Sequence, residues 1–267
     1  METWDDDLFK FEAQGAAPLP IADEQGIVAN EGAQIWYASF GTGKPVILLH
    51  GGLGNSGNWG YQVPALVDAG YQAVLIDSRG HGRSSRDTQP YSYELMASDL
   101  AAVMQSLHLD RASLVGWSDG AVTALVLAAK APSQVSGVFF FGCNVDPSGA
   151  KEFVFTAVIG RCLNRHKKDY AQLSATPDQF DRFSEAVSLM QSTQPNHSKD
   201  DLAKISVPVW IVQSEHDEFI KREHAEYLAR YIPNAKFVFL EGVSHFAPLQ
   251  RPQQFNAHML EFLREVS

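Results

Sequence analysis

The stretch LVGWSDGAV, residues 114–122, joins an apolar strand pattern to the start of a predicted helix. Ser118 lies at the turn between them, and Gly116 and Gly120 flank it in the pattern Gly-x-Ser-x-Gly. Bulky side chains at the flanks would clash where the strand and the helix approach each other, and the serine is held strained with its hydroxyl above the sheet. The stretch therefore predicts a nucleophilic serine.

The rest of the chain alternates short apolar runs with longer helical patterns. This alternation predicts an α/β fold with a mostly parallel sheet that is covered on both faces. Helical spacing of apolar residues is typical of 92–109, 222–232 and 253–266, and 119–131 is apolar almost all round. The predicted strands are 33–40, 45–50, 71–77, 112–117, 135–142, 207–214 and 235–242.

Two segments interrupt this rhythm. Residues 1–26 are acidic and then rich in Pro and Ala, and we expect an extension with little structure of its own. Residues 146–204 form a long, helix-prone segment without a convincing strand, and we interpret them as an inserted helical cap. The core would then comprise residues 27–145 and 205–267.

Composition narrows the classes of function. The 267 residues carry a formal net charge of −10, which repels phosphate backbones, so we expect no nucleic-acid partner. No apolar run approaches the 18 residues that a membrane span needs, and no secretory signal is evident. We expect a cytoplasmic protein with a small-molecule partner and no membrane partner, and we leave a homodimer open. Cys143 and Cys162 do not make a disulfide framework.

A serine nucleophile needs a base and an orienting acid, and in this kind of turn they follow in the order Ser, acid, His. His245 lies in the loop after the last predicted strand, and Asp217 lies in the loop after the preceding strand. Both loops leave the carboxyl edge of the sheet, where open α/β sheets bind ligands. The Asp119 amide, at a helix N-terminus, is placed to bind an oxyanion. Alternatives that remain open are the acids Glu215, Glu218 and Asp146 and the histidines His50, His81, His216 and His224.

Four motifs together resemble the α/β-hydrolase superfamily, over residues 30–145 and 205–267. They are LLHGGLGN (48–55), DSRGHGRSS (77–85), the GWSDG turn, and the pair Asp217 and His245, which lie 28 residues apart. The resemblance implies an eight-stranded, mostly parallel sheet with helices on both faces and a small helical cap. It also implies that the Gly52 amide completes the oxyanion hole beside Asp119.

The GWSDG turn is similar to that of valacyclovir-hydrolase-like esterases and of cofactor-free haloperoxidase-type enzymes. One departure concerns the acid loop, which reads Ser214-Glu215-His216-Asp217 where the family usually has Gly-x-x-Asp. The resemblance implies that the Arg and His of the 77–85 loop are structural. Because the nucleophile is Ser and not Asp, it points away from epoxide hydrolases and haloalkane dehalogenases.

We therefore predict a serine hydrolase of a small or medium carboxylic ester or lactone, with Ser118, Asp217 and His245 as its triad. We expect no cofactor and no metal, because the sequence has no zinc-type Cys/His spacing and no phosphate-binding loop. The alternatives are a C–C bond hydrolase of ring-cleavage products, a cofactor-free perhydrolase or haloperoxidase, and a low-turnover binding receptor. Expected pocket residues are Trp59, Trp117, Phe153, Phe219 and Phe246.

Overall fold

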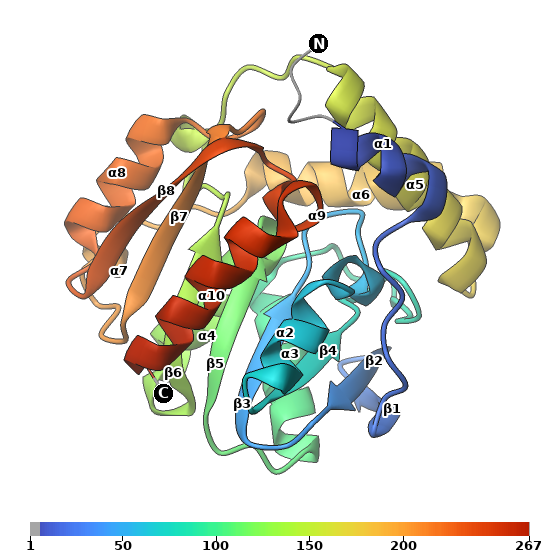
Figure 1. The fold of residues 1–267 in the computed structure, drawn as a ribbon, viewed down its shortest axis with the longest axis horizontal. Coiled ribbons are helices and arrows are strands. Elements are labelled where there is room, and N and C mark those ends of the chain that lie inside the picture. Colours follow the sequence, from blue (N-terminus) through green and yellow to red (C-terminus); the bar gives the residue numbers. More distant parts are fainter. Residues whose placement is uncertain (1–5, 267) are drawn as a thin grey trace.

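The computed structural model describes residues 6–266, which contain one eight-stranded sheet in the order β1-β2-β4-β3-β5-β6-β7-β8 (Figure 1). Strand β2 is antiparallel to both of its neighbours, whereas β3 to β8 run parallel to one another. The predicted α/β fold with a mostly parallel sheet is confirmed. The strands are β1 (Glu24–Asn30), β2 (Ala33–Phe40), β3 (Lys44–Leu49), β4 (Tyr71–Ile76), β5 (Ala112–Trp117), β6 (Val135–Phe141), β7 (Val209–His216) and β8 (Ala235–Ser244).

Helices cover both faces of this sheet. Side chains alternate between the two faces along each strand, so a buried strand contributes to a hydrophobic core on each face. In β3, Ile47 and Leu49 belong to the core that includes α3, α4 and α8, while Val46 and Leu48 belong to the core that includes α2 and α10. The helices are α1 (Asp6–Gln14), α2 (Gln62–Asp68), α3 (Tyr93–Ser106), α4 (Asp119–Lys130), α5 (Ala157–Leu173), α6 (Phe180–Thr193), α7 (Lys199–Leu202), α8 (Arg222–Tyr231), α9 (Ala247–Gln250) and α10 (Pro252–Val266).

Three of these helices, α5, α6 and α7, lie between β6 and β7, in the segment that the sequence predicts to be a cap. Figure 1 shows α5 and α6 along one end of the sheet. The start of this segment is joined to the loop after β7, since Ala150 forms an antiparallel bridge with Ile220. The division into a core and a separate cap stays a prediction.

The expectation of little structure in residues 1–26 is wrong for the part that the structure describes. Helix α1 lies beside α5 (Figure 1), and Leu8 and Phe11, three residues apart on one helical face, are buried. Strand β1 begins at Glu24 and adds to the edge of the sheet by pairing with β2. Residues 1–5 of the predicted extension lie outside the described residues. Within residues 6–266 no helix is long and apolar enough to cross a membrane.

Candidate functional site

The turn between β5 and α4 holds Ser118 in a backbone conformation that residues other than glycine rarely adopt, with φ 54° and ψ −121°. The Ser118 amide donates a hydrogen bond to the carbonyl of Phe141 at 2.8 Å, which ties the turn to β6. A Cβ atom at position 116 would lie 2.4 Å from Cα of Ala121, and one at position 120 would lie 2.1 Å from the carbonyl oxygen of Leu49. Both flanking positions therefore require glycine.

His245 and Asp217 form a buried pair at the carboxyl ends of β8 and β7. The Nδ1 atom of His245 lies 3.0 Å from Oδ2 of Asp217. The other carboxylate oxygen of Asp217 accepts the amide hydrogens of Phe219 and Ile220, each at 2.9 Å, which holds the acid in place. Burial alone would lower the pKa of His245, but the charge and the hydrogen bond of Asp217, together with the charges of Glu218 and Asp119, outweigh burial and raise it. An acceptor at Nδ1 places the proton there and leaves Nε2 free to act as a base.

The other acids that the sequence left open have different partners. Among the carboxylates that the structure describes, Asp217 is the one hydrogen-bonded to the His245 ring. The other three accept backbone amide hydrogens: Glu215 that of Gly242, Glu218 that of His245, and Asp146 that of Ser148.

Two of the other histidines form hydrogen bonds with backbone groups. The ring of His50 lies between the Gly51 carbonyl and the Ser78 amide, and that of His224 accepts the Val145 amide hydrogen. These contacts give His50 and His224 a structural role.

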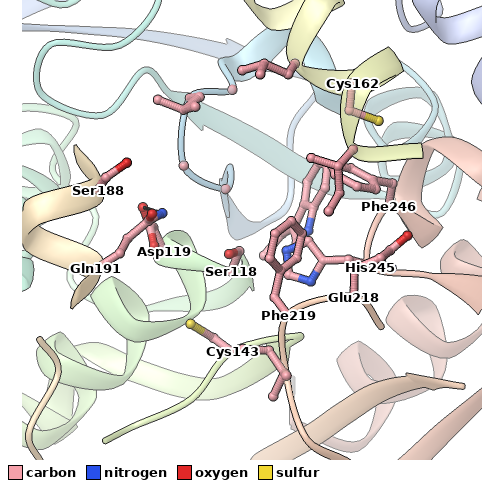
Figure 2. Close-up of a pocket in the computed structure, with 18 of the residues that line it drawn as sticks. Ser118, Asp119, Cys143, Cys162, Ser188, Gln191, Glu218, Phe219, His245 and Phe246 are labelled. Atoms are coloured by element: carbon pink, nitrogen blue, oxygen red, sulfur yellow. Dashed lines mark hydrogen bonds between the residues drawn. The ribbon is translucent and has the colours of Figure 1, made fainter. Parts of the chain in front are cut away.

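A pocket of about 560 Å³ opens between the carboxyl edge of the sheet and helices α5 and α6. Ser118 and His245 both line it, and Figure 2 shows Ser118 between Asp119 and His245. The predicted pocket residues Trp117, Phe153, Phe219 and Phe246 line it as well. Its walls are mainly apolar, and they also include Leu53, Phe155, Ile159, Leu163 and Ile220.

Trp59 does not line this pocket, so that expectation is wrong. Its side chain is fully buried beneath Trp117, with the two rings edge-on at 6.1 Å, and it also contacts Phe255 of α10. The sequence places Trp59 close to the HGG loop. The 3-10 turn Ser56–Trp59 directs the indole into the core below the sheet edge.

The predicted oxyanion-hole residues, Gly52 and Asp119, meet at the same pocket wall. Gly54 closes a turn onto the Gly51 carbonyl at 3.1 Å, and Asp119 is the first residue of α4. No acceptor for either the Gly52 or the Asp119 amide occurs among the residues that the structure describes. Two free backbone donors therefore border the pocket beside Ser118.

The side chain of Asp119 is a feature that the sequence does not predict. It is buried, and it accepts hydrogen bonds from the Tyr93 hydroxyl at 2.8 Å and from Gln191 at 3.0 Å. Burial raises the pKa of its carboxyl, and the two hydrogen bonds oppose that rise. Gln191 comes from α6 and leaves no room for a Cβ atom on Gly52, which would lie 2.5 Å from its Nε2. No local sequence pattern could have indicated this contact.

Two further pocket residues also escape sequence reasoning. Cys143, after β6, is buried beside Ser118. Burial and the Asp119 charge raise the pKa of its thiol, while hydrogen bonds with the Asn144 backbone and with Ser118 oppose that rise. His166, from α5, lines the pocket wall, and burial lowers its pKa to about 3. Both lie in segments without a recognisable motif. In the part of the chain that the structure describes, no group of three or more His, Cys, Asp or Glu residues is placed to hold a metal.

Known proteins that are similar to this chain share its α/β fold. A family model described as "alpha/beta hydrolase fold" matches residues 44–187, which is more than half of the chain. The chain belongs to the alpha/beta hydrolase family. This alpha/beta hydrolase is 27% identical to "Serine hydrolase BPHL" of Mus musculus over 267 residues, covering 95% of this chain and 91% of the relative.

Two more relatives show the range of the family. A "Putative non-heme chloroperoxidase" of Synechocystis sp. is 28% identical, with 86% of this chain and 95% of the relative covered. Among solved structures, "Est816 as an N-Acyl homoserine lactone degrading enzyme" superposes with a TM-score of 0.72 at 28% identity, covering 89% of this alpha/beta hydrolase and all of that chain.

Proposed function

We propose that this alpha/beta hydrolase cleaves small or medium carboxylic esters or lactones through an acyl-enzyme on Ser118. One observation carries the proposal: the strained Ser118 lines the same pocket as His245, and the ring of His245 is bound to the buried Asp217. A serine at such a turn, a histidine base and an orienting acid form the constellation that activates a hydroxyl for attack on a carbonyl.

In the proposed reaction His245 removes the Ser118 proton through Nε2 as the oxygen attacks the substrate carbonyl carbon. The carbonyl oxygen becomes an oxyanion, and the amides of Gly52 and Asp119 donate hydrogen bonds to it. The carbon–oxygen bond to the alcohol then breaks, and the proton on His245 passes to the leaving oxygen. Water, deprotonated by His245, attacks the acyl-enzyme and releases the carboxylic acid and Ser118.

The pocket walls support this substrate class. A volume of about 560 Å³ lies within the range of pockets that hold small molecules, and apolar side chains such as Phe153, Phe155 and Ile159 suit an aliphatic or aromatic substituent. The carboxylates of Asp119 and Glu218 border the same space and would repel the carboxylate product, which favours its release. The relatives named a serine hydrolase and a lactone-degrading enzyme support the same reaction type.

The test compares hydrolysis by the wild type, Ser118→Ala and Ser188→Ala. Substrates are p-nitrophenyl esters from acetate to octanoate and a γ-lactone. We expect kcat/KM of Ser118→Ala to fall by at least about 10⁴-fold, because the nucleophile is removed. Ser188→Ala is the matched control: it makes the same change elsewhere on the pocket wall and should stay within about threefold of the wild type.

Equal rates for the wild type and Ser118→Ala would refute the proposal. A folded wild type that cleaves neither esters nor lactones would also refute it and would favour a C–C bond substrate, peroxide-dependent chemistry or ligand binding without turnover.

A further inference from the structure

Glu218 follows Asp217 in the loop after β7 and contacts the same histidine from another side. Its Oε2 accepts the backbone amide hydrogen of His245 at 2.9 Å, while Asp217 lies 3.0 Å from ring Nδ1. The next residue, Phe219, lies edge-on to the imidazole, with 4.7 Å between ring centres. Asp217, Glu218 and Phe219 thus contact a ring nitrogen, the backbone and the ring of His245, respectively.

The second oxygen of Glu218 is not satisfied by any such contact. Its Oε1 is buried and has no hydrogen-bond partner among the residues that the structure describes. Burial raises the pKa of Glu218, and the hydrogen bond from the His245 amide opposes that rise. Above its pKa the carboxylate holds a charge in a poorly solvated place. The imidazolium of His245 is the cation that forms beside it when Ser118 loses its proton.

We propose that Glu218 is a positioning residue for the base: it fixes the backbone of His245 and favours the imidazolium over the neutral imidazole during attack by Ser118. The inference rests on the function proposed above. An interaction that strengthens as charge develops in the transition state lowers the barrier. An interaction that is equally strong in the ground state and in the transition state does not. Glu218 itself touches no reacting atom in this scheme, so its effect is exerted through His245.

Other ionisable groups face His245 and must be kept constant in a test. Asp217 and Asp119 both act with Glu218 to raise the pKa of His245. Asp217 belongs to the same loop as Glu218, whereas Asp119 belongs to α4. Two more pocket groups lie on the neighbouring segment after β6: the thiol of Cys143, and Lys151, which donates to the Asp217 carbonyl.

The test uses Glu218→Gln, which keeps the size and an acceptor oxygen but removes the charge. The matched control is Glu215→Gln, because Glu215 lies three residues earlier, at the end of β7, and also accepts a backbone amide hydrogen, that of Gly242. Its side chain is exposed and does not contact the His245 ring. Thermal melting of both variants checks that they are folded.

The first readout is an NMR titration of the imidazole of His245, assigned by comparison with His245→Gln. We expect the pKa of His245 to fall by about one unit in Glu218→Gln and to stay unchanged in Glu215→Gln, because only Glu218 places its charge beside the ring. An unchanged pKa in folded Glu218→Gln would overturn the proposal.

The second readout is ester hydrolysis as a function of pH. We expect kcat of Glu218→Gln to fall about tenfold with KM within about twofold, and the acid limb of the profile to shift to lower pH. A kcat equal to that of the wild type would overturn the proposal. A wild type that hydrolyses no ester or lactone refutes the proposed function, and the titration, which needs no turnover, still tests Glu218.

Discussion

Gly120 separates the start of α4 from the end of β3, and its replacement by alanine tests how closely the serine turn is packed. The new Cβ atom would lie 2.1 Å from the carbonyl oxygen of Leu49 and 2.7 Å from that of His50. Real Cβ contacts are not shorter than 3.0 Å, so the gap must open from 2.1 Å to at least that distance. Both obstacles are backbone atoms, so the strand or the helix has to move.

The expected cost follows from two opposing effects. Alanine is better than glycine inside a helix by about 1 kcal/mol. Overpacking that moves backbone costs up to about 3 kcal/mol. We therefore expect Gly120→Ala to lower the free energy of unfolding by about 2 kcal/mol. The shift moves Ser118 and the Asp119 amide, and a misplacement of about 1 Å costs about 10²-fold in kcat/KM.

Urea denaturation and hydrolysis of p-nitrophenyl butyrate measure both effects. The control is Gly160→Ala in α5, where the new Cβ would lie 3.3 Å from the exposed Phe155 ring, a side chain that is free to move. This variant should be as stable as the wild type or more stable by up to about 1 kcal/mol. If Gly120→Ala matches the wild type in stability and activity, the steric account of the turn is refuted.

Two further predictions concern helix α5 and its contacts. His166 is neutral in the folded protein, with a pKa of about 3, but binds a proton below about pH 6.5 when unfolded, so stability is lost as pH falls from about 6.5 to about 3. His166→Gln should reduce the slope of unfolding free energy against pH in that window by about 1.4 kcal/mol per unit, measured by urea titration at several pH values; an unchanged slope would contradict this. Phe11→Ala should cost about 3 kcal/mol, because Phe11 of α1 is buried. Phe9→Ala, where the ring is 42% exposed, should cost less than about 1 kcal/mol. Equal denaturation midpoints for Phe11→Ala and the wild type would contradict the prediction.

Local patterns in the sequence were sufficient for strands β2 to β8, the serine turn and the two loops that carry Asp217 and His245, but they did not indicate the edge strand β1. Strands such as β3 and β5 are continuous apolar runs because both of their faces are buried, and α3 begins where the Ser92 side chain accepts the Leu95 amide hydrogen. The turn at Ser118 is predictable because glycine is required on both sides by atoms within a few residues or on the adjacent strand. Parallel topology then brings the loops after β7 and β8 to the same edge.

The tertiary structure alone decided what surrounds this edge. Gln191 and His166 reach the pocket from α6 and α5, and Trp59 turns away from it into the core. The carboxylate of Glu218 lies beside Asp217 in sequence yet binds a different atom of His245. Such contacts join residues that are far apart in the chain, or they depend on which way a loop turns. Hydrophobic periodicity reports only that a segment has a buried face, whereas the packing of helices on the sheet determines which residues that face meets.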